Sequence, residues 1–498
     1  MWLDRVLSTF APQWALRRER ARVRSRLIHR HFEAASVGRR TQGWRHTSGD
    51  ANAAGSSASL QRLRDAARDL VRNNPNARSG LRTIVSNTIG TGIRATDETE
   101  AWLAWSDSTA CDADGRNTLA GLQRLAMRTV VEGGEVIIRR RGRRSEDGLP
   151  IPLQLQVLEG DYLDTAKDQS LPNGGRIIQG VELDPLGRRV AYWLFREHPG
   201  SSVSTSRSLT ASVRVPASDV VHVFSPERAG GQRGVSWFAP VILRSKDLDE
   251  FEDATLMKQK VAALLAVIST DASGGADPLG TESGDDDEID TLEPGGIHNL
   301  PAGRQIDIVS PPSVRDYADY TAVSLRAIAA GLGVAYEDMT GDYTDLPFSA
   351  ARMSRLRHWS DVEDWRWNMI IPQMLEPVRA WARAAAALVD VELPEEVEWT
   401  APGLPMIEPD KEGLAMMRNV RAGVSTLSEE VRSRGFTIDR FLDEYAADLE
   451  KLDARGIVLD VDARRVSQQG QRQADVDFPD SVDSTEEGAG AVPRAVGQ

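Results

Sequence analysis

The sequence predicts a helix-rich α+β fold in an elongated subunit, and three observations support this prediction. Apolar residues recur at helical spacing in two long segments, 237–270 and 313–330. Short alternating or β-branched runs, separated by turn signals, lie between residues 135 and 224 and predict a mainly antiparallel sheet. The two long segments flank residues 271–300, which contain nine acidic residues and no lysine or arginine. We expect those acidic residues to form an exposed excursion between the helices.

The composition limits the class of protein. Its 60 basic and 74 acidic residues give a formal net charge of −14, which excludes a uniformly basic, histone-like nucleic-acid binder. The single cysteine, Cys111, excludes a disulfide framework and a cysteine-based zinc site. Neither a membrane-spanning segment nor a signal peptide is evident, so we expect no membrane association and a reducing compartment.

The N-terminal 50 residues form a predicted basic arm, because eleven arginines stand against four acidic residues there. From charge alone, nucleic acid and an acidic protein are equally suitable partners for this arm. Residues 47–59, rich in Ser, Ala and Gly, predict a linker. Two helices follow between Leu60 and Ile89, divided at Pro75 because the residue before a proline disfavours helix.

The middle third of the chain combines further helices with the predicted strands. A short helix is expected around Trp102 and Trp105, and a longer one over residues 119–131. The predicted strands are 135–140, 153–158, 177–183, 191–196 and 220–224.

Beyond the excursion the pattern is mostly helical. Residues 297–300 and 305–309 predict short strands that close the excursion, and residues 336–348 predict a polar, aromatic loop. A helix from Ser349 is predicted to kink at Pro372, to continue to residue 389 and to precede a strand over 397–400. The following residues predict helical hairpins over 410–450, with Thr426 and Glu429 as a capping box, and a disordered polar tail from 467.

Catalytic motifs are missing from the sequence, so we expect no enzyme, no cofactor and no metal site. It has no phosphate-binding P-loop and no G-x-S-x-G nucleophile motif. Asp112 begins a stretch that resembles a calcium loop, but the glycine comes too early and a turn is the better interpretation. His222 and His358 are predicted to be structural. The acidic run 285–288 is flexible and glycine-flanked, whereas a metal site needs carboxylates that converge from rigid elements.

Seven segments stand out together, in a fixed order along the chain. They are 38–44 (GRRTQGW), 68–75 (RDLVRNNP), 90–93 (GTGI), 221–228 (VHVFSPER), 231–240 (GQRGVSWFAP), 331–343 (GLGVAYEDMTGDY) and 348–352 (FSAAR). In this order they resemble the lambda-type family of bacteriophage portal proteins. The resemblance spans roughly residues 35–450 and omits the low-complexity stretch 47–59 and the tail.

The resemblance implies a ring of about twelve subunits at one vertex of the capsid in the virion, assembled in the host cytoplasm. Double-stranded DNA would pass through its channel without sequence readout, and the partners would be the packaging terminase, head-tail connector proteins and the major capsid protein. It also implies these parts: basic arm and linker 1–59, α+β wing 60–236, first stem helix 237–270, acidic clip 271–312, second stem helix 313–333, tunnel loop 334–348, kinked wing helix and strand 349–409, helical crown 410–466 and acidic tail 467–498.

Two hypotheses about site residues follow from the resemblance. A channel that DNA passes through must not bind the phosphate backbone tightly, so we expect acidic stem and clip residues to face the channel. Solvation of the outer surface or pairing between subunits explains these acidic residues equally well. The tunnel loop is expected to touch the passing duplex, the alternative being an ordinary connecting loop. The residues concerned are Asp247, Asp249, Glu250, Glu252 and Asp253 in the stem, Asp285, Asp286, Asp287 and Glu288 in the clip, and Asp342, Tyr343, Thr344 and Asp345 in the tunnel loop.

Three other interpretations stay open at the level of sequence. A different phage structural protein, such as a head-tail adaptor, is disfavoured because such chains are much shorter. A DNA-packaging enzyme is disfavoured by the missing P-loop. A free DNA-binding protein acting through residues 1–50 would lose its DNA binding when those residues are deleted.

Overall fold

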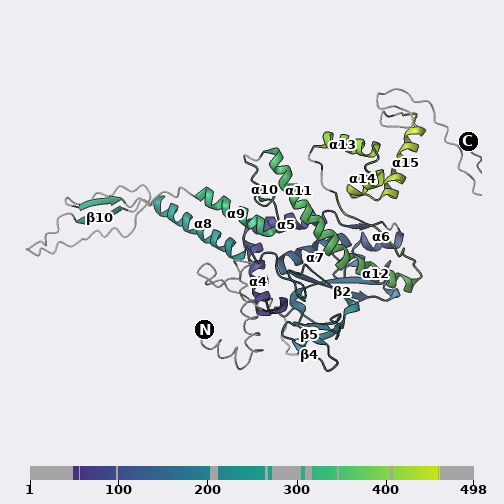
Figure 1. The fold of residues 1–498 in the computed structure, drawn as a ribbon, viewed down its shortest axis with the longest axis horizontal. Helices are drawn as coiled ribbons and strands as arrows, with labels where there is room; N and C mark the ends of the chain where they lie inside the picture. The colour runs from purple at the N-terminus through teal and green to yellow at the C-terminus, as the bar shows by residue number, and fades with distance from the viewer. Residues whose placement is uncertain are drawn as a thin grey trace, which may run out of the picture.

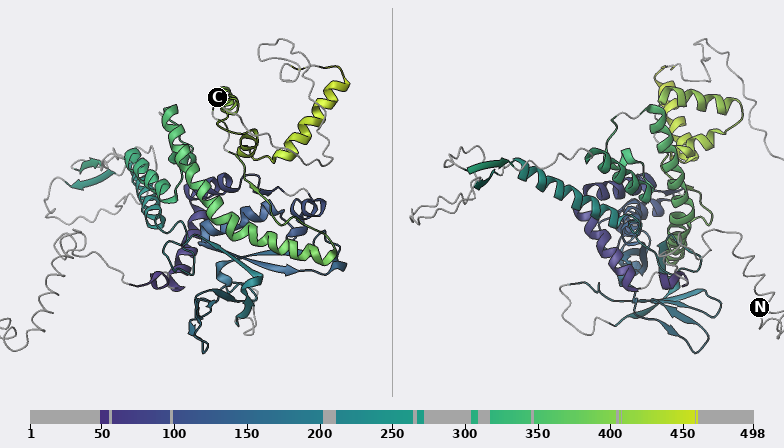
Figure 2. Two further views of the ribbon diagram at one scale, coloured as in Figure 1. Left: turned by 45° about the vertical axis from the view of Figure 1, so that its right-hand side comes forward. Right: turned by 60° about the vertical axis from the view of Figure 1, so that its left-hand side comes forward.

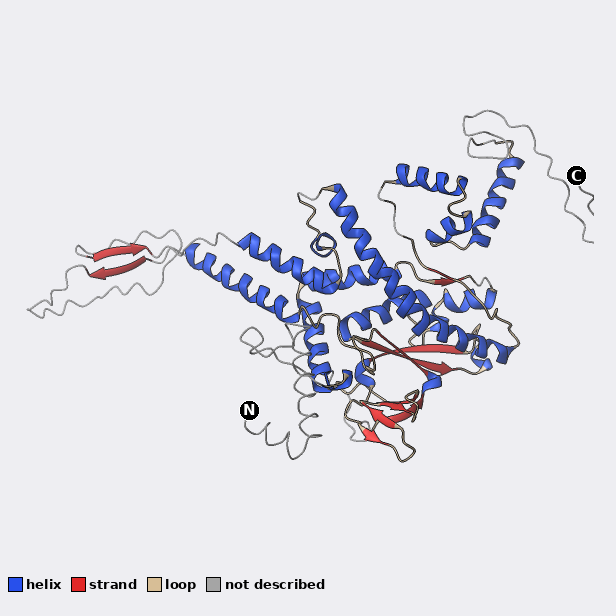
Figure 3. Cartoon of the chain, viewed as in Figure 1, coloured by secondary structure: helices blue, strands red, loops and turns tan. Residues whose placement is uncertain are grey.

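A computed structural model describes residues 49–54, 57–96, 99–201, 211–263, 267–271, 304–308, 317–344, 347–403, 406, 408–457 and 459. Helices and two larger antiparallel sheets form a central body, from which one pair of helices projects to the left in Figure 1 and three short helices stand apart at upper right. Figure 3 shows the predominance of helix over strand. The predicted helix-rich α+β class is therefore confirmed. No helix within the described ranges is long and apolar enough to cross a bilayer.

The first helices of the body are α3 (Ala51–Ala54), α4 (Ser57–Asn73) and α5 (Pro75–Ile89). The predicted break falls at Asn74, whose side chain accepts a hydrogen bond from the backbone N–H of Ala77 and caps α5, with Pro75 in the first turn. The chain turns at Gly90 (φ 54°), so the predicted end of this helix is also confirmed.

Strand β1 (Arg94–Ala95) and helices α6 (Glu100–Ser106) and α7 (Leu119–Gly133) complete the helical layer. Thr118 caps α7, and Gly134 ends it in the left-handed conformation. Trp105 is fully buried between the layers, and its indole N–H donates to the carbonyl of Leu153. The predicted helices around Trp102 and over 119–131 are confirmed.

Two antiparallel sheets replace the single predicted sheet. The first pairs β2 (Glu135–Gly142) with β3 (Leu153–Glu159) and β9 (Val220–Phe224). The predicted strand 177–183 is in fact two strands, because Gln179 (φ 47°) and Gly180 (φ 84°) form a turn inside it. The second sheet consists, in spatial order, of β4 (Gln169–Ser170), β5 (Arg176–Ile178), β6 (Val181–Leu183), β7 (Arg189–Leu194) and β8 (Val213–Pro216).

The projecting pair consists of α8 (Ile242–Ala263) and α9 (Tyr317–Leu332), which lie side by side in Figures 1 and 2. Beyond α8, strands β10 (Val267–Asp271) and β11 (Arg304–Ile308) pair antiparallel. The helix predicted over 237–270 was therefore too long: the run V-I-S-T-D, with three β-branched residues, pairs as strand. The predicted strand 297–300 lies outside the described residues.

A nearly continuous helical rod follows the short helix α10 (Tyr336–Thr340). It consists of α11 (Phe348–Trp365), a π-helical segment (Arg366–Leu375) and α12 (Glu376–Ala386). Pro372, where a kink was predicted, lies inside the π-helical segment, which accommodates a residue without a backbone N–H. Strand β12 (Trp399–Thr400) then pairs with β1, as part of the strand predicted over 397–400.

The last described elements are α13 (Pro409–Arg421), α14 (Leu427–Ser433) and α15 (Ile438–Ala454). Thr426 caps α14 by accepting from the N–H of Glu429, in line with the predicted cap. The predicted basic arm up to residue 48 and the tail from 467 lie outside the described residues. Within the predicted linker 47–59, residues 51–54 and 57–59 are helical, so the linker prediction is wrong for these residues. Short 3-10 turns occur at Thr109–Cys111, Ser145–Asp147, Gly160–Tyr162, Ala217–Asp219 and Ala387–Val389.

Candidate functional site

The segment predicted as the tunnel loop begins with a helix rather than a loop. Residues Tyr336–Thr340 form α10, in which Glu337 and Asp338 occupy the first turn and complement the helix dipole. Gly341 (φ 73°) ends the helix, and α11 begins at Phe348. The loop itself is therefore much shorter than predicted, because the acidic residues that looked like loop polarity stabilise a helix start.

Two tyrosine–aspartate hydrogen bonds connect this loop to α10. Tyr336 donates to Asp342 (Oη to Oδ2, 3.0 Å), and Tyr343 donates to Asp338 (Oη to Oδ1, 3.2 Å). Asp342 also accepts from the backbone N–H of Thr344 at 3.1 Å, and hydrogen bonds from Thr344 and Tyr336 lower the pKa of its carboxyl. The loop is thus ordered by its own side chains.

The ring of Tyr343 presents 60% of its surface to solvent, although its hydroxyl is bound. Thr344 is exposed as well, whereas Asp345 lies outside the described residues. Tyr343 borders a small polar cavity of about 250 Å³ that is also lined by Arg82, Arg355 and His358. Two arginines therefore line the same cavity as Tyr343.

His358 has the structural role that the sequence predicted. Its Nδ1 lies 2.9 Å from the carbonyl oxygen of Gly333, its Nε2 lies 3.0 Å from the Asn87 amide, and its ring meets Trp365 edge-on at 5.9 Å between centroids. It joins α11 to α5 beneath the loop.

The five predicted stem acids lie on α8, but they do not form one face. Asp247, Glu250 and Asp253 are exposed, and Glu250 pairs with Lys246 one turn earlier at 3.4 Å. Asp249 turns inward and accepts from the Asn74 amide at 2.8 Å. Partial burial, with the charges of Asp249 and Asp253 nearby, raises the pKa of Glu252. The predicted clip acids 285–288 lie outside the described residues.

Sequence reasoning missed a buried ionic centre around Glu135, at the start of β2. The fully buried carboxylate accepts from Arg233 Nε at 2.9 Å, from the backbone N–H of Gly234 at 3.0 Å and from His222 Nε2 at 3.0 Å. Burial opposes ionisation, but the charge of Arg233 and the bonds from His222 and Arg233 outweigh it and hold the pKa of Glu135 well below its usual range. The available signal was Arg233 inside the glycine-flanked segment 231–234.

Arg233 also connects separate parts of the body. Its guanidinium donates to the carbonyl oxygens of Gln179, in the turn between β5 and β6, and Gly160, at the end of β3. A few residues later Trp237 contacts Trp365 of α11 (4.9 Å between centroids), just before α8 begins. The ionic centre therefore joins both sheets to the segment from which α8 projects. His222 has the predicted structural role, and its pKa is lowered chiefly by burial.

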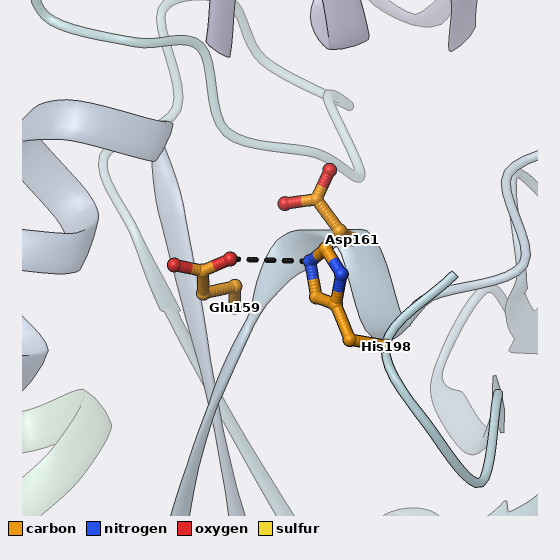
Figure 4. Close-up of side chains that lie close together, drawn as sticks. All are labelled: Glu159, Asp161 and His198. Atoms are coloured by element: carbon orange, nitrogen blue, oxygen red, sulfur yellow. Dashed lines mark ion pairs between the residues drawn. The ribbon is translucent and has the colours of Figure 1, made fainter. Parts of the chain in front are cut away.

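A second charged cluster contains the three side chains in Figure 4, Glu159, Asp161 and His198. His198 Nε2 lies 3.3 Å from Glu159 Oε2. Arg68 already pairs with Glu159 at 2.9 Å and with Asp161 at 2.5 Å, and Arg64 lies 3.8 Å from Asp161. Because the arginines satisfy these carboxylates and would repel a cation, we assign the cluster to an ionic network rather than to a metal site.

The described residues thus contain a hydrogen-bonded loop, two ionic clusters and a projecting helix pair. Over residues 37–366 the sequence matches the model of the phage portal protein, lambda family. The chain belongs to this family.

Named relatives agree with that assignment. A probable portal protein of Halomonas phage phiHAP-1 is 26% identical over 379 residues, covering 71% of this chain and 70% of the relative. Portal protein B of Escherichia phage lambda is 21% identical over 419 residues, covering 75% and 77%.

Solved structures with a similar course of the chain are more distant. The neck of a native gene transfer agent particle matches with a TM-score of 0.48 at 15% identity, covering 76% of this chain and 94% of that one. An HK97 family phage portal protein from Corynebacterium diphtheriae matches with a TM-score of 0.34 at 10% identity, covering 67% and 96%. The family assignment rests on the sequence match and not on these likenesses.

Proposed function

We propose that this portal protein forms a ring of about twelve subunits around a DNA channel at one capsid vertex of the virion. Membership of the portal family carries the proposal. The ring axis would run along the projecting pair α8 and α9, so that these helices from all subunits surround the channel as its stem.

The remaining parts take their roles from this arrangement. The two-sheet body within residues 60–236 serves as the wing, residues 271–312 as the clip, and α13, α14 and α15 as the crown. The clip docks the packaging terminase and later the head-tail connector, and the body contacts the major capsid protein. Assembly takes place in the host cytoplasm, and DNA passes without sequence-specific contacts.

Exposure on α8 supports a channel-facing role for some of the predicted stem acids and not for others. Asp249 is bound to Asn74, so it is unsuited to facing the channel, whereas Asp247, Glu250 and Asp253 are exposed on α8. Exposed acids repel phosphate and keep the duplex from binding the wall. We therefore assign the channel-facing role in α8 to Asp247, Glu250 and Asp253, with Asp285–Glu288 at the channel mouth.

The tunnel loop contributes a different kind of contact. Tyr343 and Thr344 are exposed, while Asp342 is occupied in holding the loop. An exposed aromatic ring and a hydroxyl touch a duplex without reading bases. Deleting residues 341–346 should therefore reduce DNA retention, and wild-type retention in that variant would refute a channel role for the loop.

Negative-stain imaging of the purified full-length protein tests the proposal as a whole. A ring with a central hole is the expected result, and a compact monomer at all concentrations would overturn it. Replacing residues 285–288 by Asn should then impair packaging more than ring assembly. Unchanged packaging would remove the acidic clip from the mechanism.

A further inference from the structure

An arginine-lined groove of about 560 Å³ lies between α5 and α7. Arg78 borders it on α5, Arg124 and Arg128 border it on α7, and all three side chains are exposed. Arg82, one turn after Arg78, lines this groove and also the polar cavity beside Tyr343. The groove therefore offers several positive charges to a molecule that enters it.

The two helices do not neutralise this charge themselves. The sequence of α5 contains no acidic residue, and that of α7 contains one, Glu132, which lies 3.6 Å from Arg128. Arg124 donates to the carbonyl oxygen of Gly90 at 3.0 Å, and this bond leaves its charge in place. The positive charge of the groove thus exceeds the negative charge that α5 and α7 supply.

The floor of the groove is apolar. Leu81 and Val85 of α5 line it, and Leu125 of α7 keeps 40% of its surface exposed. A phosphate backbone would satisfy the arginines but would leave this apolar surface in water. A peptide that alternates carboxylates with apolar side chains suits both, because arginine clusters bind acidic motifs and apolar side chains bury the floor.

The sequence contains such a segment near its C-terminus. Residues 475–483 read D-V-D-F-P-D-S-V-D, with four acidic residues, no basic residue and the apolar Val476, Phe478 and Val482 among the carboxylates. The segment lies outside the described residues, and Asp475 follows Ile457 by eighteen positions. In charge and in apolar content it is the complement of the groove.

Helix α15 brings the chain close to this groove. Asp443 and Glu444 of α15 line one cavity together with Ala120 and Gln123 of α7. The groove uses the same helix, from Gly121 to Arg128. The chain therefore passes beside one end of the groove before the acidic segment begins.

The remaining distance is within reach of the chain. From Glu444 to the end of α15 at Ala454 the helix rises about 15 Å, and Arg128 lies about 12 Å along α7 from Ala120. Ile457 donates its N–H back to the Leu452 carbonyl at 3.0 Å, so it stays at the helix end. The eighteen positions from there to Asp475 extend to about 60 Å, well beyond both lengths together.

The other strongly acidic stretch is less well placed. Residues 271–300 begin at the last residue of β10, which lies beyond the outer end of α8. That helix has 22 residues, or about 33 Å, and projects from the body. Helix α15, in contrast, shares a cavity with α7 itself. Position as well as charge thus favours the C-terminal segment.

We propose that the acidic segment 475–483 docks in the α5–α7 groove of its own chain. Its carboxylates pair with Arg78, Arg124 and Arg128, and its apolar side chains cover Leu125. The inference goes beyond the proposed ring, because it assigns the groove an internal ligand that a single subunit already possesses. The docked segment also screens these arginines from DNA phosphates.

Crosslinking in the full-length protein tests the docking directly. Ser79 lines the groove and Ser481 lies in the segment, so the conservative double variant S79C/S481C is treated with a short bismaleimide. Burial raises the pKa of the one native thiol, Cys111, to about 12, so it stays unmodified. Mass spectrometry should find the two new cysteines joined within one chain. The matched control S170C/S481C, with its cysteine on the exposed strand β4, should give no such product.

Charge reversal tests whether the arginines hold the segment. R78E/R128E in the S79C/S481C background should lower the crosslink yield about fivefold or more, because two attractive pairs become repulsive. Reversal of two exposed arginines in the second sheet, R176E/R188E, is the matched control and should leave the yield unchanged. Raising NaCl from about 0.05 to about 0.5 M should also lower the yield. Circular dichroism verifies that each variant is folded.

The other outcomes overturn the inference. Equal yields in S79C/S481C and S170C/S481C, or a yield that R78E/R128E does not reduce, would show a tethered segment without a docking site. In a mixture of isotopically heavy and light protein, crosslinks between heavy and light chains would place the segment on another copy. No crosslink, together with weaker DNA binding in R78E/R128E, would make the groove a DNA surface. Rings seen in the wild type leave the proposed function standing in each of these cases.

Discussion

The ionic centre at Glu135 and the loop after α10 both contain hydrogen-bonded carboxylates, but those of the ionic centre are buried and those of the loop are exposed. Glu135 is fully buried and bound by Arg233, His222 and the Gly234 N–H, so its charge is fixed inside the body. The loop residues Asp342 and Tyr343 are also hydrogen-bonded, but they stay exposed. Burial decides which charged group holds the fold and which remains available to another molecule.

Removing one partner of the buried centre should have the largest effect on stability. R233M leaves the Glu135 carboxylate buried with much of its compensation lost, which costs about 3–5 kcal/mol. Urea unfolding of the monomeric form measures this loss. The double variant E135Q/R233M should recover part of it, and equal instability of both variants would contradict a charge origin.

Acid should weaken the same centre. Glu135 has a lowered pKa when folded, so its contribution is present above its unfolded pKa and is lost as pH falls below it. The pKa of His222 is lowered from 6.5, so below about pH 6.5 the unfolded chain takes up a proton that the folded one does not. Both groups therefore lower the free energy of unfolding as the pH decreases. Thermal melts from pH 7 to 5 should show a smaller decline in H222Q than in the wild type, because that variant lacks the histidine that the unfolded chain protonates.

Substitution in the loop after α10 should affect DNA retention more than stability. Y343A removes an exposed ring and one hydrogen bond, so the free energy of unfolding should change by about 1 kcal/mol or less. DNA retention in packaged particles should nevertheless decline. A Y343A protein with wild-type retention and a large loss of stability would place Tyr343 with the structural residues.

The smallest effect on stability is expected for the exposed acids of α8. D247N/E250N breaks only the solvent-exposed pair of Glu250 with Lys246, worth at most about 0.5 kcal/mol. Its consequence should appear as slower DNA passage during packaging. D249N, which alters the contact with Asn74, is the matched comparison, because it should change stability more than packaging.

A similar contrast separates the body from the last three helices. The main apolar core runs from α4 through α7 and β2 to α12, whereas in α13, α14 and α15 Val431 is the one buried hydrophobic residue among those described. Phe441, Leu442 and Tyr445 of α15 stay partly exposed. The body is thus stabilised by its own core to a degree that these helices are not.

Local signals in the sequence determined most of the secondary structure. Pro75 after Asn74, the caps at Gly90 and Thr426 and the alternation within β2, β3 and β9 act over a few residues, so each was readable from the chain alone. The turn at Gln179 and Gly180 and the end of α8 were missed. At Gln179 and Gly180 two left-handed residues fold the run into a tight hairpin, which the alternating pattern does not reveal. Beyond α8, pairing of β10 with the distant β11 outweighed the helical pattern.

What only the tertiary structure decided is which charged residues meet. Glu135 and Arg233 are 98 residues apart, and no spacing rule connects them. Five acids on α8 look alike in sequence, yet Asn74 turns Asp249 inward. The sequence by itself determined the class, the helices and the family, because those depend on short-range preference and ordered motifs. The burial of a charged side chain and its bonding partners depend on how distant elements pack. They decide which charged groups stabilise this portal protein and which remain exposed.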